Sequence, residues 1–225
     1  MGILRSDRIT GLGGANAITG SCFFDVKNYL IIYNDISLDG DFTIEWWAHR
    51  NTGITNSDWF TIGDAKESSG LEVYIGSSGT ALKVYSNNGA ILTANSGSPS
   101  ENAWHHIAVV RSSNTIKIYV DGTVDSTTVS NSSTFTGFLR LGAGFYNGSA
   151  TIRSKMHMSN FRIVKGTAVY TSNFTPPNTR LENITGTEVL CCQSPGNIIQ
   201  EATGKTITAE RADNCLLYTS PSPRD

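Results

Sequence analysis

Two glutamates stand alone in strand-like runs, Glu45 in F-T-I-E-W-W and Glu72 in L-E-V-Y-I-G. A retaining glycosidase needs two carboxyl groups about 5–5.5 Å apart. Alternate residues of a strand point to one face, so a Glu-x-Asp-x-Glu run would supply such a pair. The chain contains no such run. We therefore predict that the protein is not an enzyme, and polysaccharide hydrolysis ranks third among its candidate functions.

Loop carboxylates are the second group that could do chemistry. Ca²⁺ takes about six to eight oxygen ligands from carboxylates and carbonyl groups. Calcium is therefore the one cofactor for which the sequence contains candidate ligands. Whether it binds stays open, because an aspartate in a turn also hydrogen-bonds its own backbone. The candidate ligands are Asp25, Asp39, Asp41, Asp121 and Asp125.

Histidine and cysteine give no metal-binding pattern. His105 and His106 are adjacent, so on a regular strand their side chains face opposite sides and cannot hold one ion. We expect one of them within the sandwich and the other at its surface. Cys22, Cys191 and Cys192 have no Cys-x-x-Cys spacing, and we predict that they are buried free thiols.

Aromatic side chains could bind sugars, because an aromatic face stacks on the C–H side of a pyranose ring while polar groups fix the hydroxyls. Trp47 and Trp104 are assigned to the core. The candidate ligand-binding residues lie on strands or near turns and are Trp59, Tyr74, Tyr85, Tyr119 and Tyr146.

Composition excludes several classes of partner. The 225 residues carry a formal net charge of −2, and only 16% are charged, so a nucleic-acid partner is disfavoured. No segment has the ~18 apolar residues of a membrane span. The N-terminus has Arg5, Asp7 and Arg8 where the apolar region of a signal peptide would lie. We therefore expect a protein made in the cytoplasm, without a signal peptide.

About a dozen short apolar runs, separated by turn residues, must position these side chains. Residues 104–129 show the pattern best, because Ile116, Ile118 and Val120 alternate with more polar neighbours and Asp121-Gly122 then turns the chain. No run has a helical period. This pattern predicts an all-β fold, a two-sheet antiparallel jelly-roll sandwich. The predicted strands cover residues 21–24, 29–33, 42–50, 59–63, 71–76, 81–86, 90–94, 104–112, 115–120, 138–144, 157–165 and 189–193.

Three motifs in order carry a family resemblance: D-F-T-I-E-W-W (41–47), W-H-H-I-A-V-V-R (104–111) and I-K-I-Y-V-D-G (116–122). With the closing run M-S-N-F-R-I-V-K-G-T-A-V-Y (158–170), the chain resembles the laminin-G-like, concanavalin A-like lectin/glucanase superfamily. The resemblance implies two curved sheets, and members bind glycans or proteins or hydrolyse polysaccharides. The closing run, with R-I-T-G-L (8–12), is similar to versions from marine phage and metagenomic virion proteins.

The chain divides into four parts. We expect an N-terminal arm over 1–20, the jelly-roll domain over 21–194, and a linker or the start of a following region over 195–214. Residues 215–225, C-L-L-Y-T-S-P-S-P-R-D, back-translate into a run that resembles a transposase-based sequencing adapter. We expect them to be an artefact and the native chain to continue past Asn214.

The function expected from these observations is non-catalytic recognition of carbohydrate, a host-surface polysaccharide, within a phage-like virion or tail structural protein. The expected partners are a glycan and other virion subunits, and the expected location is the phage particle, after synthesis in the cytoplasm of the bacterial host. The alternative is a structural decoration or assembly domain that binds proteins and has no sugar site. Whether the chain forms a homo-oligomer is left open by the sequence.

Overall fold

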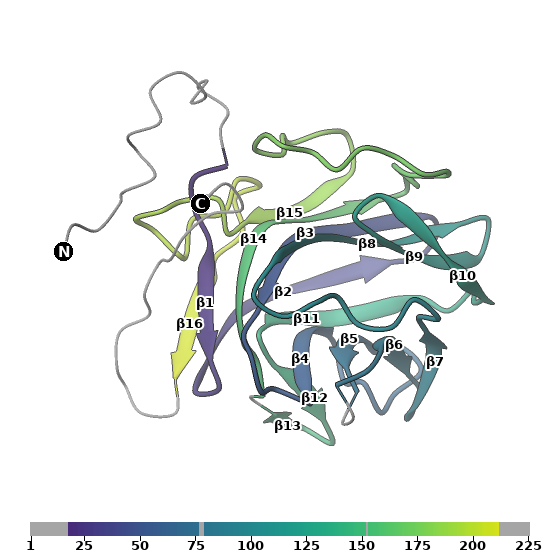
Figure 1. Cartoon of the computed structure of the whole chain (residues 1–225), viewed down its shortest axis with the longest axis horizontal. Helices are drawn as coiled ribbons and strands as arrows, with labels where there is room; N and C mark the ends of the chain where they lie inside the picture. Colours follow the sequence, from purple (N-terminus) through teal and green to yellow (C-terminus); the bar gives the residue numbers. More distant parts are fainter. Residues whose placement is uncertain (1–17, 77–78, 152, 212–225) are drawn as a thin grey trace.

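Two antiparallel β-sheets lie face to face in the computed structural model of the chain, which describes residues 18–76, 79–151 and 153–211 (Figure 1). The first sheet has the strand order β1-β14-β3-β8-β9-β10, and β15 also pairs with β14. The second sheet has the order β16-β2-β11-β4-β5-β6-β7, and β12 and β13 form a separate hairpin. The prediction of a two-sheet antiparallel sandwich is confirmed.

The strands of the first sheet are β1 (Cys22–Asp25), β3 (Phe42–Arg50), β8 (Trp104–Ser112), β9 (Thr115–Val120), β10 (Thr123–Ser130), β14 (Lys155–Lys165) and β15 (Thr187–Cys191). Those of the second sheet are β2 (Asn28–Leu38), β4 (Ser57–Ile62), β5 (Leu71–Ile75), β6 (Leu82–Ser86), β7 (Gly89–Thr93), β11 (Phe135–Leu141) and β16 (Ile207–Arg211). The hairpin consists of β12 (Gly144–Tyr146) and β13 (Ser149–Thr151).

Alternating side chains of facing strands form the core between the sheets. On β3, Ile44 and Trp46 are fully buried in it, and the Trp46 ring packs edge-on against Trp59 and Phe60 of β4 at centroid distances of 5.8 and 5.3 Å. The β4–β5 register shifts between Asp58 and Phe60, so two successive aromatic residues enter the core. Burying several side chains of this size supplies most of the driving force for folding.

A long connection between β14 and β15, residues 166–186, lies over the outer face of the first sheet (Figure 1). Its Tyr170 and Phe174 rings stack at 3.6 Å, and both rings contact Tyr119 of β9. The Phe174 amide donates a hydrogen bond to the Gly122 carbonyl over 2.9 Å. We call residues 166–186 the covering segment, because they cover the part of this face around Ala108, Val110 and Tyr119.

Two expected domain boundaries need correction. The fold continues past residue 194, since β16 pairs with β2 along Ile207–Arg211 and Ile207 is part of the core. Residues 195–211 are therefore part of the sandwich and not a linker. Of the expected arm over 1–20, residues 18–20 are described and Ile18 is buried. The R-I-T-G-L motif and the adapter-like residues 215–225 lie outside the described residues.

Candidate functional site

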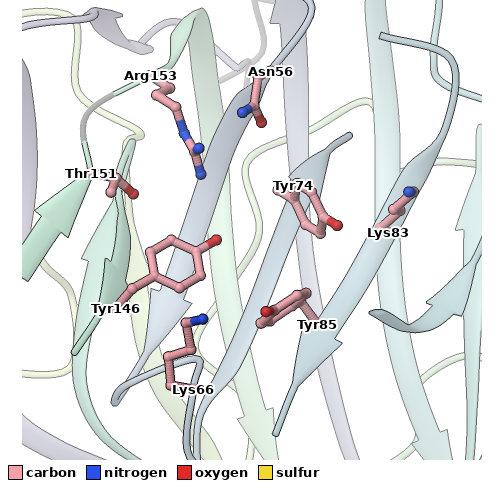
Figure 2. A pocket seen from close by; sticks show the side chains of 8 residues that line it. All are labelled: Asn56, Lys66, Tyr74, Lys83, Tyr85, Tyr146, Thr151 and Arg153. Atoms are coloured by element: carbon pink, nitrogen blue, oxygen red, sulfur yellow. The ribbon is translucent and has the colours of Figure 1, made fainter. Parts of the chain in front are cut away.

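A pocket with a volume of about 380 Å³ lies on the outer face of the second sheet, beside the β12–β13 hairpin. Figure 2 shows its side chains converging from β5, β6, the hairpin and neighbouring loops. Three are tyrosines, three are cations and two are small polar residues. The lining consists of Asn56, Lys66, Tyr74, Lys83, Tyr85, Tyr146, Thr151 and Arg153.

Strand register explains why the tyrosines meet. Val73 and Val84 point into the core, so their neighbours Tyr74 and Tyr85 point outward on the paired strands β5 and β6. Tyr146 is the last residue of β12, and the Asn147-Gly148 turn joins β12 to β13 in the hairpin. The Tyr85 ring is 5.8 Å from Tyr74 and 6.0 Å from Tyr146, each in an edge-to-face arrangement. Three of the five predicted aromatic residues therefore share one pocket.

Two carboxyl groups lie beneath these rings. Asp58 of β4 accepts two hydrogen bonds of 2.7 Å from the Arg153 guanidinium and one of 3.0 Å from the Thr151 hydroxyl. On β5, Glu72 accepts a hydrogen bond from the Tyr146 hydroxyl. The Glu-x-Asp-x-Glu run is absent, yet the fold brings these two carboxyl groups together. The two side chains come from different strands, which a motif along one strand cannot reveal.

The carboxyl of Glu72 carries a proton at neutral pH. Burial, together with the negative charge of Asp58, raises its pKa to about 9. Both carboxyl groups are fully buried, and Glu72 Oε1 has no hydrogen-bond partner among the described residues. A substrate in the pocket meets the tyrosines and cations first. The pair therefore forms the floor that holds Tyr146 and Arg153 in place and does not face the pocket as an acid and a nucleophile.

The other two predicted aromatic residues cannot reach a ligand. Trp59 is fully buried between the sheets, against Trp46. Tyr119 is fully buried under the covering segment, where its hydroxyl donates to the Tyr170 carbonyl over 3.3 Å. Trp47 and Trp104, assigned to the core, are half-buried on the outer face of the first sheet. Periodicity places a residue on a face, but it does not show what covers that face.

The five candidate aspartates do not fit a calcium ion. Asp25, Asp41 and Asp125 accept hydrogen bonds from backbone N–H groups, of Lys27, Ser113 and Ser96 respectively. These carboxylates therefore already accept backbone donors, from the same turn for Asp25 and from a distant segment of the chain for Asp41 and Asp125. Asp39 pairs with the Lys165 ammonium at 3.0 Å, and Asp121 contacts His105 at 2.7 Å. Within residues 18–76, 79–151 and 153–211, no three His, Cys, Asp or Glu side chains form a group that could hold a metal ion.

The adjacent histidines face opposite sides, as expected, but the buried one, His106, lies on the outer face of the first sheet and not within the sandwich. His105 contacts Ser100 at 2.7 Å at the surface. His106 is fully buried under the covering segment and lies 3.3 Å from Glu45. Arg162 and the Tyr170 hydroxyl also bind Glu45, at 3.0 and 2.7 Å. Burial opposes the ionisation of Glu45, but the bonds from His106 and the charge of Arg162 outweigh it and lower its pKa.

Five lining residues escaped the sequence analysis: Asn56, Lys66, Lys83, Thr151 and Arg153. Lys83 had a detectable signal, because it stands two residues before Tyr85 on one strand and so shares its face. Arg153 and Asn56 come from segments outside the strands, where no periodic pattern assigns a direction. Cys22, Cys191 and Cys192 are buried free thiols, as predicted. No helix among the described residues is long and apolar enough to span a membrane.

Comparisons with known proteins agree with this fold. The chain is 19% identical to a "putative carbohydrate binding protein" from Bacteroides ovatus, with a TM-score of 0.66 over 93% of this chain. It spans only 62% of that protein's length. A heptameric SAP-like pentraxin from Limulus polyphemus is 12% identical, with a TM-score of 0.56 over 91% of this chain and 95% of the pentraxin. No curated protein sequence matches the chain.

The sequence identities to both structures are below 25%, so these similarities establish the fold alone. A family model described as the concanavalin A-like lectin/glucanases superfamily (Laminin_G_3) matches residues 24–168, well over half of the chain. The match runs from β1 through β14 into the covering segment, and so includes every strand that lines the pocket. The chain therefore belongs to the concanavalin A-like lectin/glucanases superfamily.

Proposed function

We propose that the protein is a non-catalytic carbohydrate-recognition module, that it binds a polysaccharide in the tyrosine-lined pocket, and that it does so as part of a phage-like virion. The observation that carries the proposal is the convergence of Tyr74, Tyr85 and Tyr146 with polar side chains around one hollow. Aromatic rings supply apolar contact area for a pyranose, and hydroxyl and amide groups supply hydrogen bonds.

The surroundings of the pocket support recognition without catalysis. The Glu72 and Asp58 side chains are fully buried below the rings, and both Asp58 oxygens are occupied by Arg153. A glycosidase acid has to reach the glycosidic oxygen, and its partner has to reach the anomeric carbon or a water molecule beside it. The virion context rests on the sequence resemblance to phage proteins, and a host-surface polysaccharide is the partner that fits it.

Replacing Tyr85 by alanine is expected to weaken polysaccharide binding at least about tenfold, or about 1.4 kcal/mol. Tyr85 is the central ring of the three, so its loss removes the contact surface and both ring–ring contacts. Calorimetric titration of the full chain with a panel of bacterial and algal oligosaccharides measures the effect.

Tyr33→Ala is the matched control, because Tyr33 lies on β2 of the same sheet, is 53% exposed and does not line the pocket. Equal losses in the two variants, or cleavage of any oligosaccharide on the panel, would contradict the proposal. A folded chain that binds no glycan but captures a purified virion subunit would favour the assembly role.

Removal of calcium is expected to leave the affinity unchanged. The described pocket lining contains no carboxylate, and the five loop aspartates already hold N–H donors or cationic side chains. The same titration in EDTA and in millimolar calcium checks this. A severalfold loss of affinity in EDTA would show that an ion takes part in binding. It would contradict the conclusion that these aspartates serve only hydrogen bonds and ion pairs within the fold.

A further inference from the structure

The pocket is positively charged although the whole chain has a net charge of −2. Lys66, Lys83 and Arg153 line it, and none of the described lining residues is a carboxylate. Arg153 is already matched by Asp58, which binds its guanidinium twice. The charge that remains available to a ligand is therefore that of the two lysines.

The carboxyl groups nearby are not among the described residues that line the pocket. Glu72 is uncharged at neutral pH because burial and the Asp58 charge keep its proton in place. Asp64 accepts hydrogen bonds from the backbone amides of Lys66 and Gly148, at 3.0 and 2.9 Å, and so stabilises the loops instead of filling the pocket.

Of the two lysines, Lys83 has the ammonium that is free of partners among the described residues. It pairs in register with Tyr74 on β5, and Figure 2 shows its side chain beside Tyr74 and Tyr85 at the rim of the hollow. The described residues offer its ammonium neither an ion pair nor a hydrogen bond. Lys66, by contrast, donates to the Asn88 side chain, which also accepts from the Tyr85 hydroxyl at 3.2 Å.

We propose that the pocket selects acidic sugars, binding the carboxylate or sulfate group of the saccharide through Lys83, with Lys66 as its second cation, while the sugar ring rests against Tyr85. This inference rests on the proposed function and names its ligand class. The three groups suit one ligand: an ammonium is a compact donor for an anionic oxygen, and an adjacent aromatic face takes the C–H side of the same residue. A neutral sugar would leave the Lys83 ammonium without a partner.

The test is titration of the full chain with three oligosaccharides of similar length: an oligouronate, a sulfated galactan and a neutral glucan. Lys83→Met removes the charge and keeps an unbranched stem, and Lys117→Met on β9 of the other sheet is the control of equal net charge. We expect the wild type to bind an acidic oligosaccharide at least about tenfold more tightly than the neutral one. Lys83→Met should abolish this preference, and Lys117→Met should keep it within about twofold.

The three oligosaccharides distinguish a carboxylate from a sulfate ligand. They also distinguish a failure of the acidic-sugar inference from a failure of the proposed function. The tighter of the two acidic ligands identifies a carboxylate or a sulfate as the recognised group. Equal losses in Lys83→Met and Lys117→Met would mean unspecific attraction to a polyanion and would overturn the inference. Tyr85-dependent binding of the neutral glucan with equal affinity would overturn it as well, yet uphold the proposed function. Absence of binding in all three arms would contradict both.

Discussion

Replacing Arg162 by methionine is expected to lower the free energy of unfolding by about 3–5 kcal/mol, the cost of leaving a buried charge without its partner. Arg162 of β14 and Glu45 of β3 are paired under the covering segment, and Glu45 is fully buried. The variant would leave the carboxylate with His106 and the Tyr170 hydroxyl. Urea denaturation monitored by fluorescence measures the difference.

Lys165→Met, three residues further along the same strand, is the matched control. The Lys165–Asp39 ion pair is solvent-exposed, and such pairs contribute about 0–1 kcal/mol. Adding Glu45→Gln to Arg162→Met removes the unpaired charge and should recover part of the loss. If Arg162→Met costs no more than Lys165→Met, the Glu45 carboxylate does not depend on Arg162 as its buried partner.

The second large effect concerns pH. The pKa of Glu72 is higher in the folded than in the unfolded protein, so between the ordinary glutamate value and about 9 the folded state binds more protons. The stability contributed by this group is therefore complete at acid pH and falls as the pH rises through that window. The slope for one proton is at most about 1.4 kcal/mol per pH unit. Glu72→Gln should remove this slope and make the protein more stable than wild type at pH 8–9.

Urea midpoints measured at intervals from pH 5 to 9 give the slope for each variant. Glu67→Gln is the control, because Glu67 is an exposed glutamate in the β4–β5 loop, close to the pocket but outside its floor. It should follow the wild-type curve. A Glu72→Gln curve parallel to that of the wild type would show that Glu72 is ionised in the folded protein, and the floor of the pocket would then need another description.

Strands that alternate strongly could be predicted from the sequence. The predicted limits 42–50, 104–112 and 115–120 match β3, β8 and β9, because each run is a continuous stretch rich in apolar, β-branched and aromatic residues that ends at polar turn residues. The strands β10, β12, β13 and β16 are not predicted as separate elements. In β10, T-V-D-S-T-T-V-S, half of the side chains are exposed and polar, so hydrophobic periodicity is weak. The hairpin strands have only three residues each.

The candidate site was predictable only in part. Tyr74 and Tyr85 could be assigned to strands, and an alternating pattern places them on the face opposite to the valines. Trp59 breaks that rule, since the register shift beside it turns its ring into the core. The Glu72–Asp58 pair depends on which strands are neighbours, and the pairing of β4 with β5 is a property of the fold, not of either segment.

The central claim is that the tyrosine pocket is the place where carbohydrate binds. Backbone and side-chain NMR chemical shifts, followed while an acidic oligosaccharide is added to the full chain, locate the contact directly. We predict that the largest changes fall on Tyr74, Lys83, Tyr85 and Tyr146 and saturate with a single dissociation constant. Changes concentrated instead on the outer face of the first sheet, around Trp47, Trp104 and the covering segment, would contradict the account.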